Sequence, residues 1–170
     1  KEAYLAIDDR RFTYYVYDEL GRERYIIPPI AYEALRASQN SPQGPSYFHD
    51  YCYYTEYDAM NRVIKSYKPG KDYEYFVYDK RGRLVLSQDG NLRAKRQWFY
   101  TVYDNQTRVR EKALVKDNNT SVMSRQMLQM VFDIADYSYP FYRNSGNYLT
   151  PVDGFEVVTH LESIRYDNYY

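Results

Sequence analysis

The chain has 170 residues, and its 23 Lys and Arg residues are balanced by 23 Asp and Glu residues. This length suits one domain with a core of its own, and zero net charge gives no global attraction to nucleic acid or to anionic membranes. The single cysteine, Cys52, excludes an internal disulfide, and two histidines nearly exclude a zinc cluster. No segment approaches the ~20 apolar residues of a membrane helix.

Tyrosine is the outlier of the composition, with 24 copies against 7 Phe and 1 Trp. Tyrosine favours strands and joins an apolar ring to a polar tip, so its abundance predicts a sheet whose faces are half buried. Most of these rings fit that interpretation. A few are candidates for stacking on sugars or bases.

A Tyr-Asp pair recurs along the chain, with its tyrosine at positions 17, 57, 78, 103 and 166. The spacings of 40, 21, 25 and 63 residues lie near multiples of about 21, which indicates a repeated supersecondary unit. In the copy at 73–88, residues alternate as in a strand on both sides of a four-residue break. This copy therefore predicts a β-hairpin.

The break predicts a tight turn. Asp79 can accept a hydrogen bond from the backbone two residues on, and Gly82 supplies the positive φ of a type I turn that ends in a bulge. Arg83 then starts the return strand near Asp79. The β-branched Thr107 resists positive φ, so we expect the fourth turn to be altered. The repeat residues with a predicted structural role are Tyr17, Asp18, Gly21, Arg22, Tyr57, Asp58, Asn61, Arg62, Tyr78, Asp79, Gly82, Arg83, Tyr103, Asp104 and Arg108.

The alternation predicts an antiparallel meander. Its strands lie near residues 12–17, 22–27, 51–57, 62–67, 73–78, 83–88, 93–103 and 108–115. Residues 28–46 interrupt it with a proline stop, a helical turn and a polar loop. An amphipathic helix follows near 121–135, where one face carries Met123, Met127, Met130, Val131 and Ile134 as an expected core seam. Residues 153–160 return to a strand pattern.

These elements predict a mainly β fold with a minor α component: a meander of hairpins plus one amphipathic helix. We expect a hairpin region over 1–116, clearest at 51–115. Residues 117–170 then form a C-terminal part, with a helix and short strands packed on the same domain.

The segment YTEYDAMNRVIKSYKPGKDYEYFVYDKRGRLVLSQDGN, residues 54–91, resembles the YD-repeat (rearrangement-hotspot, Rhs) family, especially the large surface-associated members of Bacteroidetes. The resemblance covers 51–115 well, 12–24 partially and the region after 116 weakly. The copy from Tyr78 to Arg83 fits the repeat signature throughout, whereas two copies depart from it at Asn61 and Thr107.

The resemblance implies a long sheet of hairpins. In complete family members this sheet winds into a hollow shell that encloses a toxin or displays a surface outside the cell. Related repeats are linked to carbohydrate binding and cell–cell contact. The autoproteolytic signature of the family is missing from this sequence, so the resemblance implies no protease activity.

An enzymatic function needs a differentiated pair of carboxylates, as in a glycoside hydrolase. The repeat aspartates instead recur at equivalent turn positions, and the common catalytic motifs are missing. His49 and His160 fit loop or strand-end positions better than those of bases. Asp117–Asn119 lacks the glycine and the bidentate glutamate of a calcium loop, so we predict no enzyme, no metal site and no cofactor.

A binding function would use exposed aromatic rings. Trp98 lies in the basic, aromatic segment RAKRQWFYTVY and, with Tyr100, Arg96 and Tyr75, forms a candidate site for polysaccharide. Single-stranded nucleic acid is a less favoured ligand. In the structural alternative, Trp98 fills the core under the meander.

A scaffold function is favoured over both. Open arrays of hairpins leave their end strands uncovered, so the expected partners are flanking repeats of a larger protein or a neighbouring chain. The chain begins without Met or an apolar leader, so we interpret it as a segment of a surface or secreted protein whose export signal lies outside it.

Overall fold

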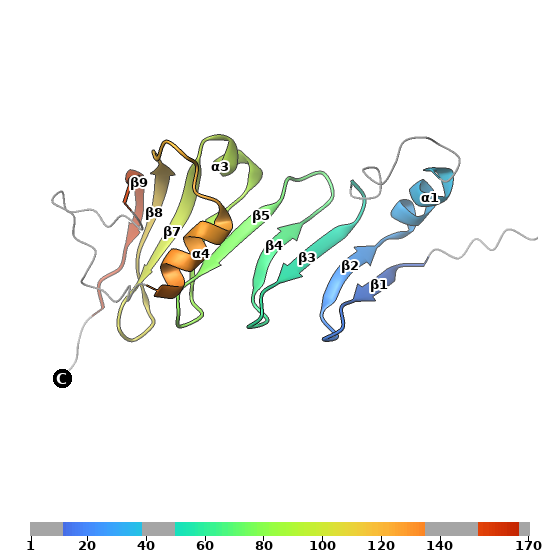
Figure 1. Ribbon diagram of the computed structural model, residues 1–170, viewed down its shortest axis with the longest axis horizontal. Coiled ribbons are helices and arrows are strands. Elements are labelled where there is room, and N and C mark those ends of the chain that lie inside the picture. Colours follow the sequence, from blue (N-terminus) through green and yellow to red (C-terminus); the bar gives the residue numbers. More distant parts are fainter. Residues whose placement is uncertain (1–11, 39–49, 135–152, 167–170) are drawn as a thin grey trace, which may run out of the picture. The chain divides into compact units, whose positions relative to one another are not determined.

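The computed structural model describes residues 12–38, 50–134 and 153–166 (Figure 1). These residues form nine strands, which follow one another in chain order from β1 to β9, and three short helices. The strands are β1 (Tyr14–Tyr17), β2 (Glu23–Ile27), β3 (Tyr53–Tyr57), β4 (Val63–Tyr67), β5 (Glu74–Tyr78), β6 (Leu84–Gln88), β7 (Gln97–Tyr103), β8 (Val109–Asp117) and β9 (Phe155–Ser163). The helices are α1 (Pro29–Ser38), α3 (Gly90–Ala94) and α4 (Arg125–Ile134). The predicted mainly β antiparallel meander is confirmed.

Two element predictions need correction. The expected strand over 93–103 begins only at Gln97, because Asp89 caps the short helix α3 by accepting a hydrogen bond from the Leu92 amide. The helical turn expected within 28–46 extends to the ten residues of α1. Pro29 suits the first position of a helix, where the missing N–H would have no intrahelical partner. Of the three helices in the described ranges, none combines the length and the apolar character of a membrane span.

The chain divides into two compact units, which are described in turn. The first contains Lys1–Glu56 and Tyr67–Lys71, and the second contains Tyr57–Ser66 and Asp72–Tyr170. In the first unit β2 pairs with β1 on one side and with β3 on the other. Cys52 is fully buried beside β3, and burial raises the pKa of its thiol to about 11.

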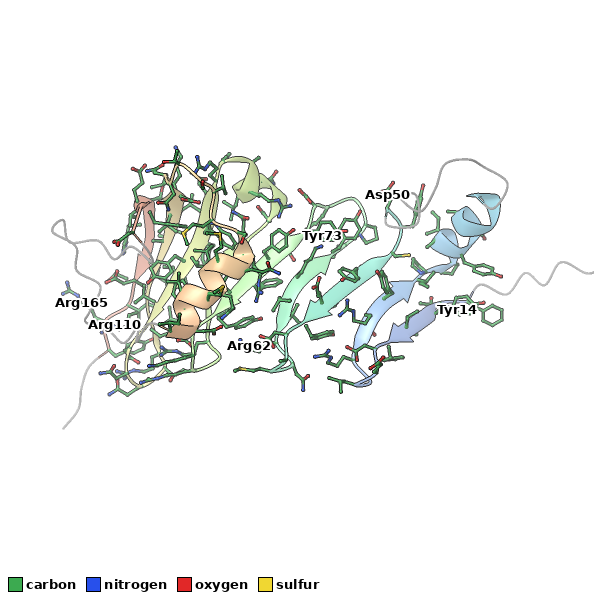
Figure 2. The ribbon with its side chains drawn as sticks, viewed as in Figure 1. Tyr14, Asp50, Arg62, Tyr73, Arg110 and Arg165 are labelled. Atoms are coloured by element: carbon green, nitrogen blue, oxygen red, sulfur yellow. The ribbon has the colours of Figure 1, made fainter. Side chains whose placement is uncertain are left out.

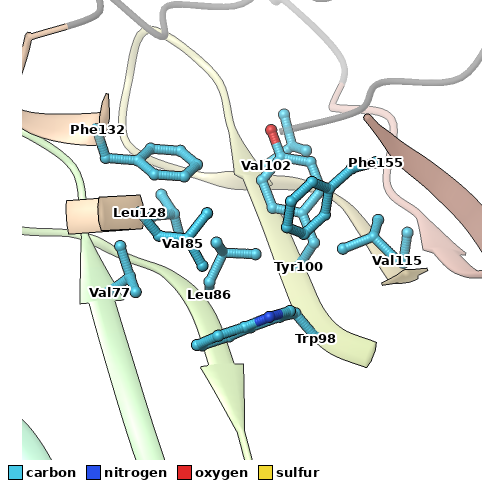
Figure 3. Packing of buried hydrophobic residues seen from close by; sticks show 11 residues of the cluster. Val77, Val85, Leu86, Trp98, Tyr100, Val102, Val115, Leu128, Phe132 and Phe155 are labelled. Atoms are coloured by element: carbon cyan, nitrogen blue, oxygen red, sulfur yellow. The ribbon is translucent and has the colours of Figure 1, made fainter. Parts of the chain in front are cut away.

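The second unit holds the hydrophobic core (Figure 3). Strand β7 shows how it forms: Trp98, Tyr100 and Val102 alternate with less buried residues and point to one face. Helix α4 and strands β5, β6, β8 and β9 supply the remaining side chains. The cluster consists of Val77, Val85, Leu86, Trp98, Tyr100, Val102, Ala113, Val115, Leu128, Phe132 and Phe155.

The predicted core seam of the helix is wrong at Met127, Met130 and Ile134, whereas Met123 does pack against the core. Leu128, Gln129 and Phe132 are buried, whereas Met130 is 64% exposed and Ile134 is 82% exposed. The rotation of the helix follows from polar contacts with β5. The Arg125 Nε donates to the Phe76 carbonyl over 2.9 Å.

The side-chain amide of Gln129 forms the pair of backbone hydrogen bonds with β5 that a neighbouring strand would otherwise form. Its Oε1 accepts from the Tyr78 N–H at 3.0 Å, and its Nε2 donates to the Tyr78 carbonyl at 2.7 Å. The register of β4 on β5 runs through the pairs Lys65–Tyr75 and Ser66–Glu74, away from this end of β5. A side chain of α4 therefore satisfies the backbone N–H and carbonyl of Tyr78. This hydrogen bonding determines which face of the helix is buried.

Candidate functional site

The recurring motif closes four turns with the same hydrogen bonds. In the most deeply buried copy, the Asp79 Oδ1 accepts hydrogen bonds from the backbone N–H groups of Arg81 and Arg83, both at 2.9 Å. The Asp79 Oδ2 accepts from the Arg83 Nε at 2.6 Å, and Gly82 has φ +78°. Asp18, Asp58 and Asp104 repeat these contacts in their own turns. One aspartate thus binds both the turn backbone and the arginine that begins the next strand.

The surroundings of these aspartates differ in burial. The Asp79 and Arg83 side chains are 4% and 9% exposed, whereas Asp18 and Arg22 are 18% and 20% exposed. Backbone and side-chain hydrogen bonds from Arg22 hold the pKa of Asp18 below its usual value. At Asp58 and Asp104 burial raises the pKa, but the hydrogen bonds from the turn and its arginine outweigh burial and lower it. All three carboxylates are therefore charged at neutral pH.

The expectation of an altered fourth turn is wrong. Thr107 adopts φ +66°, and its amide donates to the Asp104 carbonyl at 3.1 Å, as the amides of Gly21, Asn61 and Gly82 do in the other copies. The hydrogen bonds from Asp104 to the turn backbone and to Arg108 are all present. Several such bonds outweigh the cost of about 1–2 kcal/mol for one β-branched residue in the left-handed region.

We expect Thr107→Gly to stabilise the protein by about 1 kcal/mol, because glycine adopts this φ without a Cβ clash. The urea midpoint of unfolding measures the gain. The matched variant Gly82→Thr should lower the midpoint, because Gly82 has φ +78°, which strains a β-branched residue. Nothing lies within 4 Å of an added Cβ, so the loss would come from the backbone conformation and not from a clash. Equal midpoints for all three proteins would contradict the assigned backbone strain.

Three of the turn arginines, among them Arg62 (Figure 2), also reach the next tyrosine of the series. The Arg62 guanidinium lies 4.8 Å from the Tyr78 ring centroid, and its Nη1 donates to the Asp79 carbonyl at 3.3 Å. The Arg83 guanidinium lies 4.8 Å from the Tyr103 ring and donates to the Asp104 carbonyl at 3.1 Å. We call this arrangement the arginine clasp.

The tyrosine completes each clasp with its hydroxyl. Tyr78 Oη donates to the Val63 carbonyl at 2.7 Å, and Tyr103 Oη donates to the Leu84 carbonyl at 2.9 Å. In both cases the acceptor directly follows the clasp arginine. Burial raises the pKa of both Tyr78 and Tyr103.

A third clasp joins Arg108 to Tyr166. The guanidinium lies 4.2 Å from the ring, and Tyr166 Oη donates to the Val109 carbonyl at 3.0 Å. The spacing of the motif now has a physical cause: aspartate and arginine close one turn, and the same arginine holds the next tyrosine.

The residues predicted to bind a ligand lie in different settings. Trp98 and Tyr100 are each 2% exposed and belong to the core. A core position is what the alternative, structural interpretation of Trp98 predicted. Tyr75 lies under the Arg93 guanidinium at 4.8 Å. Arg96 turns to the loop after β8, where its Nη2 donates to the Asn119 carbonyl. Ligand binding by these four residues stays a prediction.

Asp117 organises the loop that leads to α4. Its side chain is 1% exposed, accepts from both the backbone and the side-chain nitrogens of Asn119 at 2.9 Å, and accepts from the Met123 amide at 2.8 Å. His160 lies on β9 with its Nε2 3.8 Å from a Glu111 carboxylate oxygen. His49 falls outside the described residues. Across the described ranges no cluster of His, Cys, Asp and Glu has the geometry of a metal site.

One hollow that the sequence patterns did not predict lies beside α3. It has a volume of about 240 Å³ and combines two phenylalanine rings with two carboxylates. Alternation on β5 and β7 could have revealed it, because Phe76 and Phe99 alternate with the core residues Val77, Trp98 and Tyr100 and therefore face away from the core. The lining residues are Glu74, Phe76, Ser87, Gln88, Asp89, Leu92 and Phe99.

Comparison with known families finds no family model that matches, and no curated protein matches either. Among solved structures, similarity is found to chains in crystal structures of TcdB2-TccC3-Cdc42 and TcdB2-TccC3-TEV. The TM-scores are 0.46 and 0.45, with 20% sequence identity over 65% of this chain in both cases. The chain spans only 5% of the length of either of them.

Proposed function

We propose that this chain is a non-enzymatic structural segment of a larger secreted or cell-surface protein of YD-repeat type, similar to those of Bacteroidetes. Its hairpins form a β-scaffold, and its partners are flanking repeats or a neighbouring protein chain. The observation that carries the proposal is the arginine clasp. The residues that define the motif are engaged in holding a turn closed and in attaching the next hairpin.

The chemistry of the aspartates supports a structural role over catalysis. Asp58, Asp79 and Asp104 each bind the arginine four residues on and the amides of their own turn. A hydrolase needs two carboxyl groups whose environments separate their pKa values. Three carboxylates that are held in the same way, each by one arginine and by the amides of its own turn, offer no such differentiated pair, which suits a scaffold.

Carbohydrate binding is the second candidate function, and the hollow beside α3 favours it. Sugar rings stack on aromatic faces, which Phe76 and Phe99 offer, while Glu74 and Ser87 supply polar partners. A thermal-shift screen against bacterial and host polysaccharides tests this candidate. A shift that is lost in Phe99→Ala would support it.

The scaffold proposal is tested by a double-mutant cycle on Arg83 and Tyr103. We expect the two substitutions Arg83→Gln and Tyr103→Leu to be coupled by about 1–2 kcal/mol in unfolding free energy, because each removes the same clasp. Urea unfolding of the four proteins in the cycle measures the coupling.

The control cycle replaces Arg83→Gln by Arg81→Gln. Arg81 is an exposed cation in the same turn, so its substitution should add to Tyr103→Leu without coupling. Additive effects in both cycles would remove the clasp as a source of cohesion, and with it the main support for the scaffold.

A further inference from the structure

The free side of β1 carries one half of an arginine clasp. Strand β1 pairs with β2 through the pairs from Tyr14–Ile27 to Tyr17–Glu23, and the described residues place no strand along its other side. All four residues of β1 are exposed, and Tyr17 is 57% exposed. Exposed strand edges of this kind readily pair with another strand.

The sequence of β1 matches the two strands that receive a clasp. Residues 15–18 read Tyr-Val-Tyr-Asp, residues 76–79 read Phe-Val-Tyr-Asp, and residues 101–104 read Thr-Val-Tyr-Asp. The rings of Tyr78 and Tyr103 each lie 4.8 Å from the guanidinium of an arginine in the preceding turn. Among the described residues, no guanidinium stacks on Tyr17.

The Asp18 turn also presents the matching backbone acceptor. Asp18 closes its turn as the other aspartates do, and its carbonyl accepts from the Gly21 amide at 2.9 Å. In the complete clasps the Asp79 and Asp104 carbonyls accept both this turn amide and the arginine of the neighbouring hairpin. A carbonyl oxygen has two lone pairs, so Asp18 can take a second donor in the same manner.

We infer that the free edge of β1 docks a β-hairpin whose turn has the form Asp-x-x-(Gly/Asn/Thr)-Arg, supplied by a segment joined ahead of this chain in the same polypeptide. The guanidinium of that hairpin stacks on Tyr17 and donates to the Asp18 carbonyl. Tyr17 Oη donates to the carbonyl that follows the arginine. The inference rests on the proposed scaffold function and names the chemistry of its partner.

The partner is specified by three requirements taken from the internal clasps. Its strand must run antiparallel to β1, as β4 does to β5 and β6 does to β7. Its cation must be arginine, because the contact joins a flat guanidinium on a ring with an N–H to a carbonyl. Its aspartate must orient that arginine from four residues before.

The test adds a hairpin to the full chain. A copy of residues 53–67, which contains the turn from Asp58 to Arg62, is fused ahead of Lys1, and Tyr17→Leu is measured with and without it. In the parent chain we expect Tyr17→Leu to change the melting temperature by less than about 1 °C, since the ring is exposed. In the fused chain the same substitution should lower it by about 3 °C.

The matched control is the fused chain in which the grafted arginine is replaced by glutamine. There the effect of Tyr17→Leu should return to the parent value, and the amides of β1 should lose the hydrogen-exchange protection that the graft confers. Equal effects of Tyr17→Leu in all three chains would overturn the inference. So would a concentration-dependent dimer of the parent chain that Tyr17→Leu abolishes, because the edge would then belong to a second copy.

This outcome is separable from that of the scaffold proposal. Coupling between Arg83 and Tyr103 without any effect of the graft on Tyr17 would reject the docking edge alone. Absence of both couplings would reject the clasp as a principle of assembly.

Discussion

We expect Trp98→Ala to lower the free energy of unfolding by about 3–5 kcal/mol, the range of large-to-small changes in a packed core. The indole is 2% exposed and belongs to the cluster that Leu128, Phe132 and Phe155 complete from α4 and β9. Its removal leaves a cavity in a layer that joins the strands to the helix. Urea unfolding followed by circular dichroism measures the loss, since the variant has no tryptophan for fluorescence.

The control for this prediction is Phe99→Ala. Phe99 lies next to Trp98 on the same strand, but it points to the opposite face and is only half buried. Its loss should cost less than half as much stability. If Trp98→Ala left unfolding unchanged and instead removed a polysaccharide-induced thermal shift, Trp98 would be a recognition residue and not a core residue.

The turns could be predicted from the sequence because their contacts are local. Asp79, Gly82 and Arg83 meet within five residues, so the chemistry of each residue type suffices to propose the hydrogen bonds. The error at Thr107 shows the limit of residue-by-residue reasoning. The β-branched side chain of Thr107 by itself disfavours positive φ, whereas the combined hydrogen bonds of Asp104 decide the conformation.

The arginine clasp could not be predicted in the same way. Arg83 and Tyr103 are 20 residues apart, and their contact depends on the register between neighbouring hairpins. The repeat period of about 21 residues was the available signal, because a repeat with arginine at one end and tyrosine at the other brings them together whenever units stack.

The buried face of α4 shows a different limit. Hydrophobic periodicity selects Met127, Met130 and Ile134, but the helix buries Gln129 in their place. Gln129 satisfies both the amide and the carbonyl of Tyr78. A pattern that scores only apolar residues cannot anticipate a polar residue that is buried to complete a backbone, because the unsatisfied group lies about 50 residues away in the sequence.

The second large effect is expected at Asp79. Substitution Asp79→Ala should destabilise the protein by about 3–5 kcal/mol, because it leaves the 9% exposed Arg83 side chain without its counter-ion and removes the acceptor of two turn amides. The added substitution Arg83→Leu should recover part of this loss, since the stranded charge is the dominant cost. Urea unfolding of the single and double variants measures both effects.

The matched variant is Asp18→Ala, which removes the same hydrogen bonds in a turn of the same form. Its ion pair with Arg22 is 18–20% exposed, so water can solvate the remaining guanidinium and the loss should be clearly smaller. A larger effect at Asp79 than at Asp18 would show that the stability of the motif comes from its burial between neighbouring hairpins. Equal effects would place it within the isolated turn, and the clasp would then add recognition between hairpins without adding stability.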